Sequence, residues 1–408
     1  MAIKKIRISN FKSFKDVETE LSKVNILIGP NESGKSNFIK IFGFLRDITL
    51  YGLSNAILMQ GGVKYFRNVK IGPSKDFSLR IVYDQESMFH ITKEKRTIMI
   101  KANEAIYEFA VAFDREDEFE ISKDKLTLQC EFFEIAKSKK KEELAEIGTG
   151  EITLSNVKGK LKYDLNLPGD DIFPILLTEI DIPSRTLLME TSFFFFMPLF
   201  EKFIKNISIY DFKSHLVREE TVEAKMELEE DGSNLPIVLR TIMKDKEKKR
   251  KFLNLTRNLL PFLEELTIRT HEDNSLSLNF REKYTSETYL PISFASIGTI
   301  TMIELIIALY FEEKPLTIIE EPARNIHPFL ISRVMDMLKE ASENKQIIVT
   351  THNPEIVKYA DLENLLFISR DKEGFSTISK PGEKEGVKTF LKNEIGIEEL
   401  YIQNLLEV

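Results

Sequence analysis

Cysteine and histidine are scarce in this chain of 408 residues, which has one cysteine, Cys130, and five histidines. One cysteine excludes a disulfide framework and any multi-cysteine zinc or iron–sulfur site, and the few histidines leave little material for a zinc enzyme. Long apolar runs are also missing. The longest, residues 192–200, falls well short of the ~20 residues that a membrane helix needs. The first residues, MAIKKIRISNF, turn polar too soon for a signal peptide. We therefore expect a cytoplasmic protein with no membrane partner.

The composition is that of a globular protein, with 42% hydrophobic and 30% charged residues. The 57 Lys and Arg against 65 Asp and Glu give a net charge of -8. This balance argues against a surface covered in positive charge for nucleic acid, although it allows a local basic patch. A chain of this length is expected to form two to three domains.

Hydrophobic periodicity changes along the chain. It predicts α/β segments at both ends, short antiparallel strands after residue 76, and mainly helices from 185 to 265. The predicted strands cover residues 3–8, 24–28, 77–83, 105–113, 125–133, 151–154, 161–165, 316–319, 346–351 and 364–369. The predicted helices of the two ends cover residues 36–45, 299–311 and 328–342, with a helical tail. We expect an α/β core that is split in sequence, and three parts: an N-terminal lobe (1–185), a mainly helical region for insertion or dimerisation (186–290) and a C-terminal lobe (291–408).

Residues 29–36 read GPNESGKS and match the phosphate-loop pattern G-x-x-x-x-G-K-[ST]. Glycines let backbone N–H groups turn toward phosphates, and the helix that follows adds its positive N-terminus. Lys35 can reach the β- and γ-phosphates, and the hydroxyl of Ser36 can hold Mg²⁺. The pattern lies between an apolar strand and an amphipathic helix, which is the context that it requires.

Three further segments carry candidate site residues. Residues 316–322, LTIIEEP, deliver Glu320 and Glu321 to the end of an apolar strand, where one carboxylate can hold Mg²⁺ and the other activate water. His352 follows another apolar strand in IIVTTHNP, where it can sense a γ-phosphate or simply cap a helix. In SFASIGT, Ser296 and Gly298 precede a helix and can either meet a phosphate or form an ordinary N-cap.

Together and in this order, the motifs resemble the ABC-type ATPase heads of the SMC and RecF class. They are most similar to the OLD-like AAA-family ATPases of bacterial defence loci. The resemblance rests on IRISNFKSFKD (6–16), GPNESGKSN as Walker A, SIGT as signature, IIEEP as Walker B and TTHNP as histidine switch. The chain departs from the group at Ile297, where an acidic residue is usual. It also departs at Ala323 and Arg324, where Glu and Asn are frequent.

The resemblance implies an ABC-type ATPase head with an antiparallel β lobe and a helical middle insertion, using ATP and Mg²⁺. Glu321 would activate water, His352 would sense the γ-phosphate, and Ser36 with Glu320 would hold the metal. The residues that it implies for nucleotide binding are Lys12, Ser13, Gly29, Asn31, Glu32, Ser33, Gly34, Lys35, Ser36, Asn37, Ser296 and Gly298.

In such heads, ATP is clamped between the Walker A of one protomer and the signature of another. The resemblance therefore implies a homodimer or a larger even-numbered oligomer that forms on ATP binding. The chain shows no Toprim carboxylates and no H-N-H pattern. This suggests that the ATPase holds or activates a separately encoded effector, such as a nuclease or toxin, in anti-phage defence.

Two alternatives remain open at this point: a RecF-like repair ATPase that acts directly on DNA, and a scaffold that binds ATP without hydrolysing it. The basic runs 137–141 and 244–251 can bind a nucleic-acid backbone or form solvated faces. The phenylalanines at 193–196 can dock a partner or belong to the core.

Overall fold

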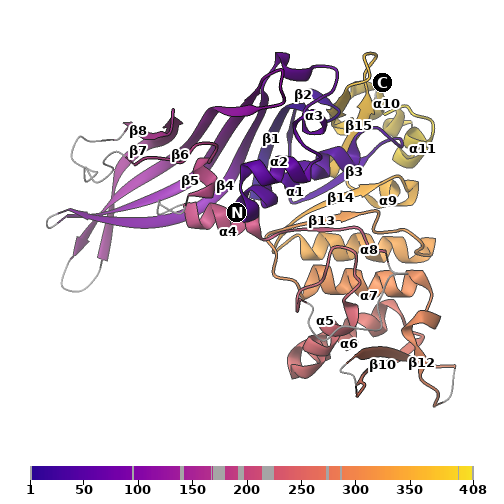
Figure 1. The fold of residues 1–408 in the computed structure, drawn as a ribbon. Coiled ribbons are helices and arrows are strands. Elements are labelled where there is room, and N and C mark those ends of the chain that lie inside the picture. Colours follow the sequence, from indigo (N-terminus) through magenta and orange to yellow (C-terminus); the bar gives the residue numbers. More distant parts are fainter. Residues whose placement is uncertain are drawn as a thin grey trace. The chain divides into compact units, whose positions relative to one another are not determined.

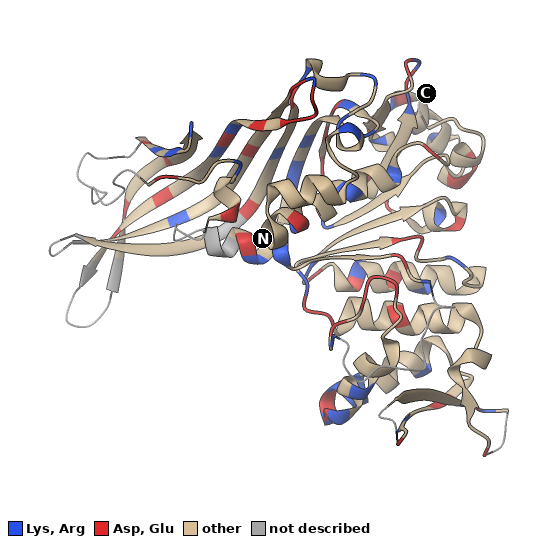
Figure 2. Cartoon of the chain, in the orientation of Figure 1, with Lys and Arg blue, Asp and Glu red and all other residues tan. Residues whose placement is uncertain are grey.

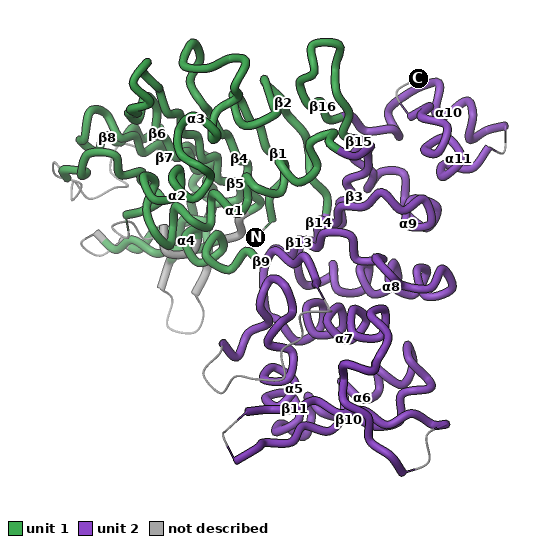
Figure 3. The backbone as a smooth tube through the Cα atoms, turned by 45° about the vertical axis from the view of Figure 1, so that its right-hand side comes forward, with its two compact units in different colours: residues 1–22, 32–207, 368–378 green, residues 23–31, 208–367, 379–408 purple. Residues whose placement is uncertain are grey.

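The computed structural model describes residues 2–93, 96–137, 142–166, 168, 180–191, 197–213, 225–272, 275–284, 287–393 and 395–406. The chain divides into two compact units (Figure 3), each assembled from three separate stretches of sequence. Unit 1 comprises residues 1–22, 32–207 and 368–378, and unit 2 comprises residues 23–31, 208–367 and 379–408. The three-part division predicted from the sequence remains a prediction.

Unit 1 contains a large sheet with the strand order β8-β7-β6-β5-β4-β1-β2-β16 (Figure 1). Its neighbours pair antiparallel except at β16, which meets β2 in parallel where Ser376 lies opposite Phe14. The strands are β1 (Ala2–Phe11), β2 (Phe14–Glu20), β4 (Phe77–Lys93), β5 (Arg96–Phe113), β6 (Phe119–Lys137), β7 (Glu142–Val157), β8 (Lys160–Asn166) and β16 (Ser376–Ser379). The strands β4 to β7 form the antiparallel β lobe.

The helices of unit 1 are α1 (Lys35–Tyr51), α2 (Leu53–Met59), α3 (Val63–Phe66) and α4 (Met197–Lys205). Apolar residues at helical spacing give α1 a buried face, and its Phe44 joins a cluster of aromatic rings with Phe11, Phe66 and Phe77. The closest ring centroids, Phe44–Phe66 and Phe66–Phe77, are 4.7 Å apart. Such pairs add roughly 0.5–1.5 kcal/mol each beyond their buried area. The cluster therefore holds α1, and with it the loop that precedes α1.

Unit 2 contains strands in the order β15-β3-β14-β13-β9. They are β3 (Val24–Ile28), β9 (Ile207–Tyr210), β13 (Leu316–Glu320), β14 (Gln346–Thr351) and β15 (Leu365–Arg370), and the chain crosses between the units within β9 and within β15. Three of these pairs are parallel: β13 with β14, β14 with β3, and β3 with β15. Because these strands are buried, they read in the sequence as continuous apolar runs rather than as alternating patterns.

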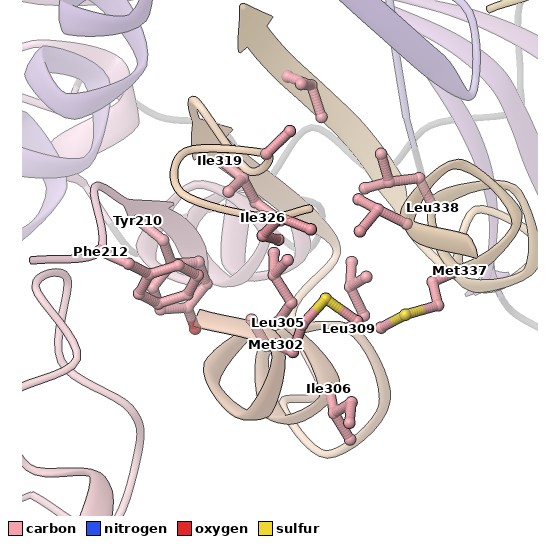
Figure 4. Close-up of a cluster of buried hydrophobic side chains, with 14 of the residues drawn as sticks. Tyr210, Phe212, Met302, Leu305, Ile306, Leu309, Ile319, Ile326, Met337 and Leu338 are labelled. Carbon is pink, nitrogen blue, oxygen red and sulfur yellow. The ribbon is translucent and has the colours of Figure 1, made fainter. Parts of the chain in front are cut away.

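The other elements of unit 2 surround a second core. They are α5 (Leu235–Lys244), α6 (Lys246–Leu259), α7 (Ile297–Tyr310), α8 (Pro328–Ala341), α9 (Pro354–Tyr359), α10 (Glu385–Lys392), α11 (Ile397–Ile402) and the small antiparallel sheet β10 (Leu263–Thr270), β11 (Leu276–Glu282) and β12 (Leu290–Pro291). Figure 4 shows Leu305 and Leu309 of α7 beside Ile319 of β13 and Leu338 of α8. Apolar residues cover α7 on all sides, which is typical of a helix in the middle of a core.

Most predicted elements are confirmed, with these differences. The strands β2, β10, β11, β12 and β16 were not expected, and residues 151–154 and 161–165 belong to the longer strands β7 and β8. Between 185 and 265 the described residues form α4, α5 and α6, but β9 interrupts them and β10 begins at Leu263. In the described part of the chain, no helix is long and apolar enough to cross a membrane.

Candidate functional site

The parallel strands of unit 2 bring three predicted motifs to one edge. In the register of the sheet, Glu320 lies opposite Thr350, and Thr351 lies opposite Ile28. The carboxyl ends of β13, β14 and β3 therefore coincide, which is where open α/β sheets bind their ligands. Glu321 directly follows the end of β13, His352 the end of β14, and Gly29 the end of β3. The structure thus places both glutamates, the histidine and the start of the phosphate loop (29–36) together.

Glu321 and His352 contact each other directly. Nδ1 of His352 lies 2.6 Å from Oε1 of Glu321, and because a carboxylate only accepts, Nδ1 carries the proton. The other carboxylate oxygen, Oε2, accepts from the backbone N–H of His352 and from the hydroxyl of Thr351, both at 3.3 Å. Glu321 has a left-handed backbone with φ 50°, and its N–H donates to the carbonyl of Thr350. The end of β14 therefore orients the Glu321 carboxylate.

The first residue of the phosphate loop is held by the C-terminal part of unit 2. The hydroxyl of Tyr401, on α11, donates to the carbonyl of Gly29 at 3.4 Å. Burial, together with the negative charge of Glu321, raises the pKa of Tyr401, so its hydroxyl remains a donor at neutral pH. Gly29 has φ 152°, and Asn31, two residues later, is exposed.

The rest of the loop lies in unit 1 and leads into α1. Gly34 caps this helix in a left-handed conformation with φ 119°, which favours glycine. A Cβ atom on Gly34 would also overlap the hydroxyl oxygen of Ser376, on β16. Lys35 and Asn37 are half-buried and Ser36 is exposed, all in the first turn of α1. A helix N-terminus preceded by a glycine turn is suited to bind phosphate.

Side chains outside the motif hold the backbone of the loop. Nε of Arg370 donates to the carbonyl of Glu32 at 2.9 Å, and the hydroxyl of Ser376 donates to the carbonyl of Ser33 at 2.6 Å. The sequence prediction missed Arg370, Ser376 and Tyr401. The DKEG turn at 371–374 is typical of a hairpin and could have indicated the strand that carries Ser376, but not the contacts of Arg370 or Ser376 with the loop.

The two residues expected from the first turn of the chain have different surroundings. Ser13 is buried and its hydroxyl accepts from Nδ2 of Asn37 at 2.9 Å, behind the loop. Nζ of Lys12 donates to the carbonyls of Gln60 and Tyr65, so its charge faces the backbone of unit 1. Burial, and secondarily the charge of Lys40, lowers the pKa of Lys12 to about 8.

Ser296 and Gly298 form the start of α7. The hydroxyl of Ser296 accepts from the N–H of Thr299 at 3.1 Å, so Ser296 is an N-cap, one of the two roles considered from the sequence. Gly298 lies against the loop after β13, because a Cβ atom there would be 2.5 Å from the carbonyl oxygen of Asn325. Ser296 is exposed, and so is Ile297.

Of the other candidate segments, the structure describes residues 244–251. Residues 244–251 lie at the end of α5 and along the exposed start of α6, where six basic side chains stand with Asp245 and Glu247 (Figure 2). In the basic run 137–141, positions 138–141 lie outside the described residues, and so do the phenylalanines at 193–196. The described residues contain no cluster of three or more metal-binding side chains. A serine hydroxyl and a carboxylate fit Mg²⁺, which is usually held by one or two protein oxygens together with substrate phosphates.

Comparison with known proteins agrees with this architecture. A family model described as an "AAA domain" of the "AbiEii toxin, Type IV TA system" kind matches residues 24–358. Among curated proteins, none matches the sequence. Two similar solved structures are an Smc head bound to the C-winged helix domain of ScpA and an Smc head with an extended coiled coil bound to the C-terminal domain of ScpA from Pyrococcus furiosus.

The first of these structures is 17% identical, with a TM-score of 0.51, and the match covers 93% of this chain and 97% of that chain. The second is 14% identical, also with a TM-score of 0.51, and the match covers 96% and 99%. At this level of identity the likeness establishes the fold. The predicted fold, an ABC-type ATPase head, is therefore confirmed.

Proposed function

The chain belongs to the AAA-domain family whose model it matches, and we propose that it binds and hydrolyses ATP at composite sites formed between protomers. The observation that carries this proposal is the shared edge of β3, β14 and β13, where the phosphate loop begins beside Glu320, Glu321 and His352. Catalysis of phosphoryl transfer depends mainly on positioning and on electrostatic stabilisation, and this edge supplies both.

The residues of the loop would hold the nucleotide as a row of donors. Lys35 would bind the β- and γ-phosphates, and backbone N–H groups of the loop would complete the cradle. Ser36 and Glu320 would hold Mg²⁺, which neutralises charge on the phosphates when bound. Glu321 would orient and deprotonate the attacking water, because its carboxylate is fixed by Thr351 and His352.

The exposed start of α7 is suited to act on the nucleotide of a second protomer. Ser296 caps the helix, and the N-terminus of a 14-residue helix favours negative charge. A chain that carries both a phosphate loop and such a segment can form two equivalent sites in a two-fold dimer. The number of ATP sites would then equal the number of protomers, and an even-numbered oligomer would follow.

We further propose that ATP turnover controls a separately encoded effector in an OLD-like, anti-phage defence role. Two findings support this: the family description names a toxin of a toxin–antitoxin system, and the similar Smc heads are bound to a domain of another protein, ScpA. The role is tested by challenging cells that carry this gene, with and without its neighbouring genes, with phage. Protection that needs both this gene and one neighbour supports the role. If cells are protected neither with nor without the neighbouring genes, the role is overturned.

The enzymatic part is tested by steady-state ATP hydrolysis over a range of protein concentrations. We expect turnover to rise more than linearly with protein, and Glu321→Gln to lower it by at least about 100-fold, because the general base is lost. Glu363→Gln, which changes an exposed glutamate, is the matched control. A wild-type rate no higher than that of Glu321→Gln would favour the ATP-binding scaffold. Stimulation by added DNA would favour the RecF-like alternative.

A further inference from the structure

Two consecutive carbonyls of the phosphate loop are anchored by the turn between β15 and β16, which belongs to no recognised motif. Arg370 binds the carbonyl of Glu32, and Ser376 binds the carbonyl of Ser33. In a trans peptide, the C=O of one residue and the N–H of the next point in opposite directions. The two anchors therefore turn the N–H groups of Ser33 and Gly34 to the other side of the loop. Within the described part of the chain, neither N–H has an acceptor.

The Ser376 anchor belongs to a buried network of polar side chains. A hydroxyl has one proton, and that of Ser376 goes to the carbonyl of Ser33 at 2.6 Å. The hydroxyl of Ser376 also lies 2.8 Å from that of Ser13, which accepts from Nδ2 of Asn37. Bonds in such a network polarise one another. Ser13, Ser33 and Ser376 are all buried, so water does not compete at this point.

The turn itself is firmly held within unit 1. Nη1 of Arg370 donates to the carbonyl of Gly374 at 2.8 Å, which closes the turn on itself. Nζ of Lys15 pairs with Glu373 at 3.1 Å and lies 5.0 Å from the ring centroid of Phe375. Nζ of Lys70 also lies 5.4 Å from the centroid of the Phe375 ring. Anchors that are themselves fixed can set the orientation of the loop before a ligand arrives.

We propose that Ser376 and Arg370 are positioning residues for nucleotide phosphates. This proposal rests on the proposed function, because it concerns the same loop. Ser376 directs the N–H of Gly34, and Arg370 directs the N–H of Ser33, toward the place where a phosphate group binds. Both act through the loop backbone, so they serve nucleoside diphosphates and triphosphates alike and do not distinguish bases.

The test compares the affinities of the folded variants for MgADP and MgATP by isothermal titration calorimetry. We expect Ser376→Ala to weaken both by about tenfold, because the carbonyl of Ser33 loses its donor and the peptide can rotate. Ser376→Thr keeps the hydroxyl and is expected to bind within about twofold of wild type. The matched control is Ser379→Ala on the same strand, whose buried hydroxyl has no hydrogen-bond partner in the described structure. It is expected to bind as wild type does.

Two further variants keep the test decisive if Ser376→Ala does not fold. Ser13→Ala removes only a neighbouring hydroxyl and leaves the bond from Ser376 to the carbonyl of Ser33 in place, so we expect a smaller loss of affinity than for Ser376→Ala. Arg370→Gln is expected to lose affinity several-fold, with Arg333→Gln, an exposed arginine elsewhere, as its control. A purely structural role would lower the melting temperature without changing the affinity of the folded protein.

The outcomes separate the two proposals. Wild-type affinity in both Ser376→Ala and Arg370→Gln overturns the positioning role, and so does a Ser376→Thr variant as weak as Ser376→Ala, because packing rather than the hydroxyl would then matter. A wild-type protein that binds neither nucleotide overturns the proposed function itself.

Discussion

Gly298 offers a sharp test of how the start of α7 is linked to the loop that carries Glu321. A Cβ atom at Gly298 would lie 2.5 Å from the carbonyl oxygen of Asn325, about 1 Å closer than the ~3.5 Å optimum for such a contact. The loop cannot simply recede. Asn325 is left-handed with φ 61°, and backbone bonds join Arg324 to Glu321 and Ile326 to Ala323. Gly298→Ala must therefore displace either the first turn of α7 or this loop.

The cost can be worked from these contacts. Overpacking of this kind costs about 1–3 kcal/mol, and a gain of up to about 1 kcal/mol from the better helix propensity of alanine opposes it. We expect a net loss of about 1–2 kcal/mol, or roughly 2–8 °C in melting temperature for a unit of this size. The displaced loop begins at Glu321, and a shift of about 1 Å at a catalytic group can lower the rate ~100-fold. We therefore expect a large loss of ATP turnover beside this small loss of stability.

The assay measures the melting temperature, the affinity for ATP and the turnover of Gly298→Ala beside Gly382→Ala. At Gly382 a Cβ atom would meet the side chain of Leu362 at 3.1 Å, and a side chain can yield where a backbone carbonyl cannot. We expect the control to keep its turnover. A Gly298→Ala variant that hydrolyses ATP at the wild-type rate would refute the reasoning, because the loop would then not be linked to α7 through this contact.

The remaining predictions concern stability. Burial raises the pKa of Asp124 from 3.8 to about 7, so between these pH values the folded state keeps a proton that the unfolded state has lost. The free energy of unfolding should therefore fall as pH rises from about 4 to about 7, by on the order of 4 kcal/mol. Asp124→Asn should flatten this dependence in denaturant titrations, and equal slopes in both proteins would contradict the assignment. Ile297 is exposed in the first turn of α7, so Ile297→Asp should raise stability by about 0.5 kcal/mol through the helix dipole. High salt should remove that gain in stability, and a gain that persists in high salt would contradict the helix-dipole explanation.

The parts of the candidate site that could be predicted from sequence are those whose residue types and spacing are typical of phosphate chemistry. Gly29, Gly34 and Lys35 have the spacing that phosphate-binding loops share, and Glu320, Glu321 and His352 follow clearly apolar strands. The register of the sheet then brings them together, as the predicted split core requires. The parallel strands were predictable for the same reason: burial on both faces leaves a continuous apolar run.

The anchors behind the loop could not be predicted, because they bind backbone. Ser376 lies 343 residues from Ser33 in the sequence, and a carbonyl accepts from any donor, so no residue type at a fixed spacing marks the contact. The strand β16 is only four residues long, too short for an alternating pattern to stand out. The contact of Tyr401 with Gly29 likewise depends on how α11 packs, and such a tertiary contact leaves no pattern in the local sequence.

The contact between Glu321 and His352 shows why the two motifs belong together. Glu321 is the first residue after β13, and its backbone is left-handed with φ 50°. Within the described residues, the three donors to its carboxylate come from the end of β14 and the residue after it: the hydroxyl of Thr351, and the backbone N–H and ring of His352. Parallel pairing of β13 with β14 puts these donors in reach, since Glu320 and Thr350 are in register. The segments IIEEP and TTHNP therefore act together: the first supplies the Glu321 carboxylate, and the second orients it.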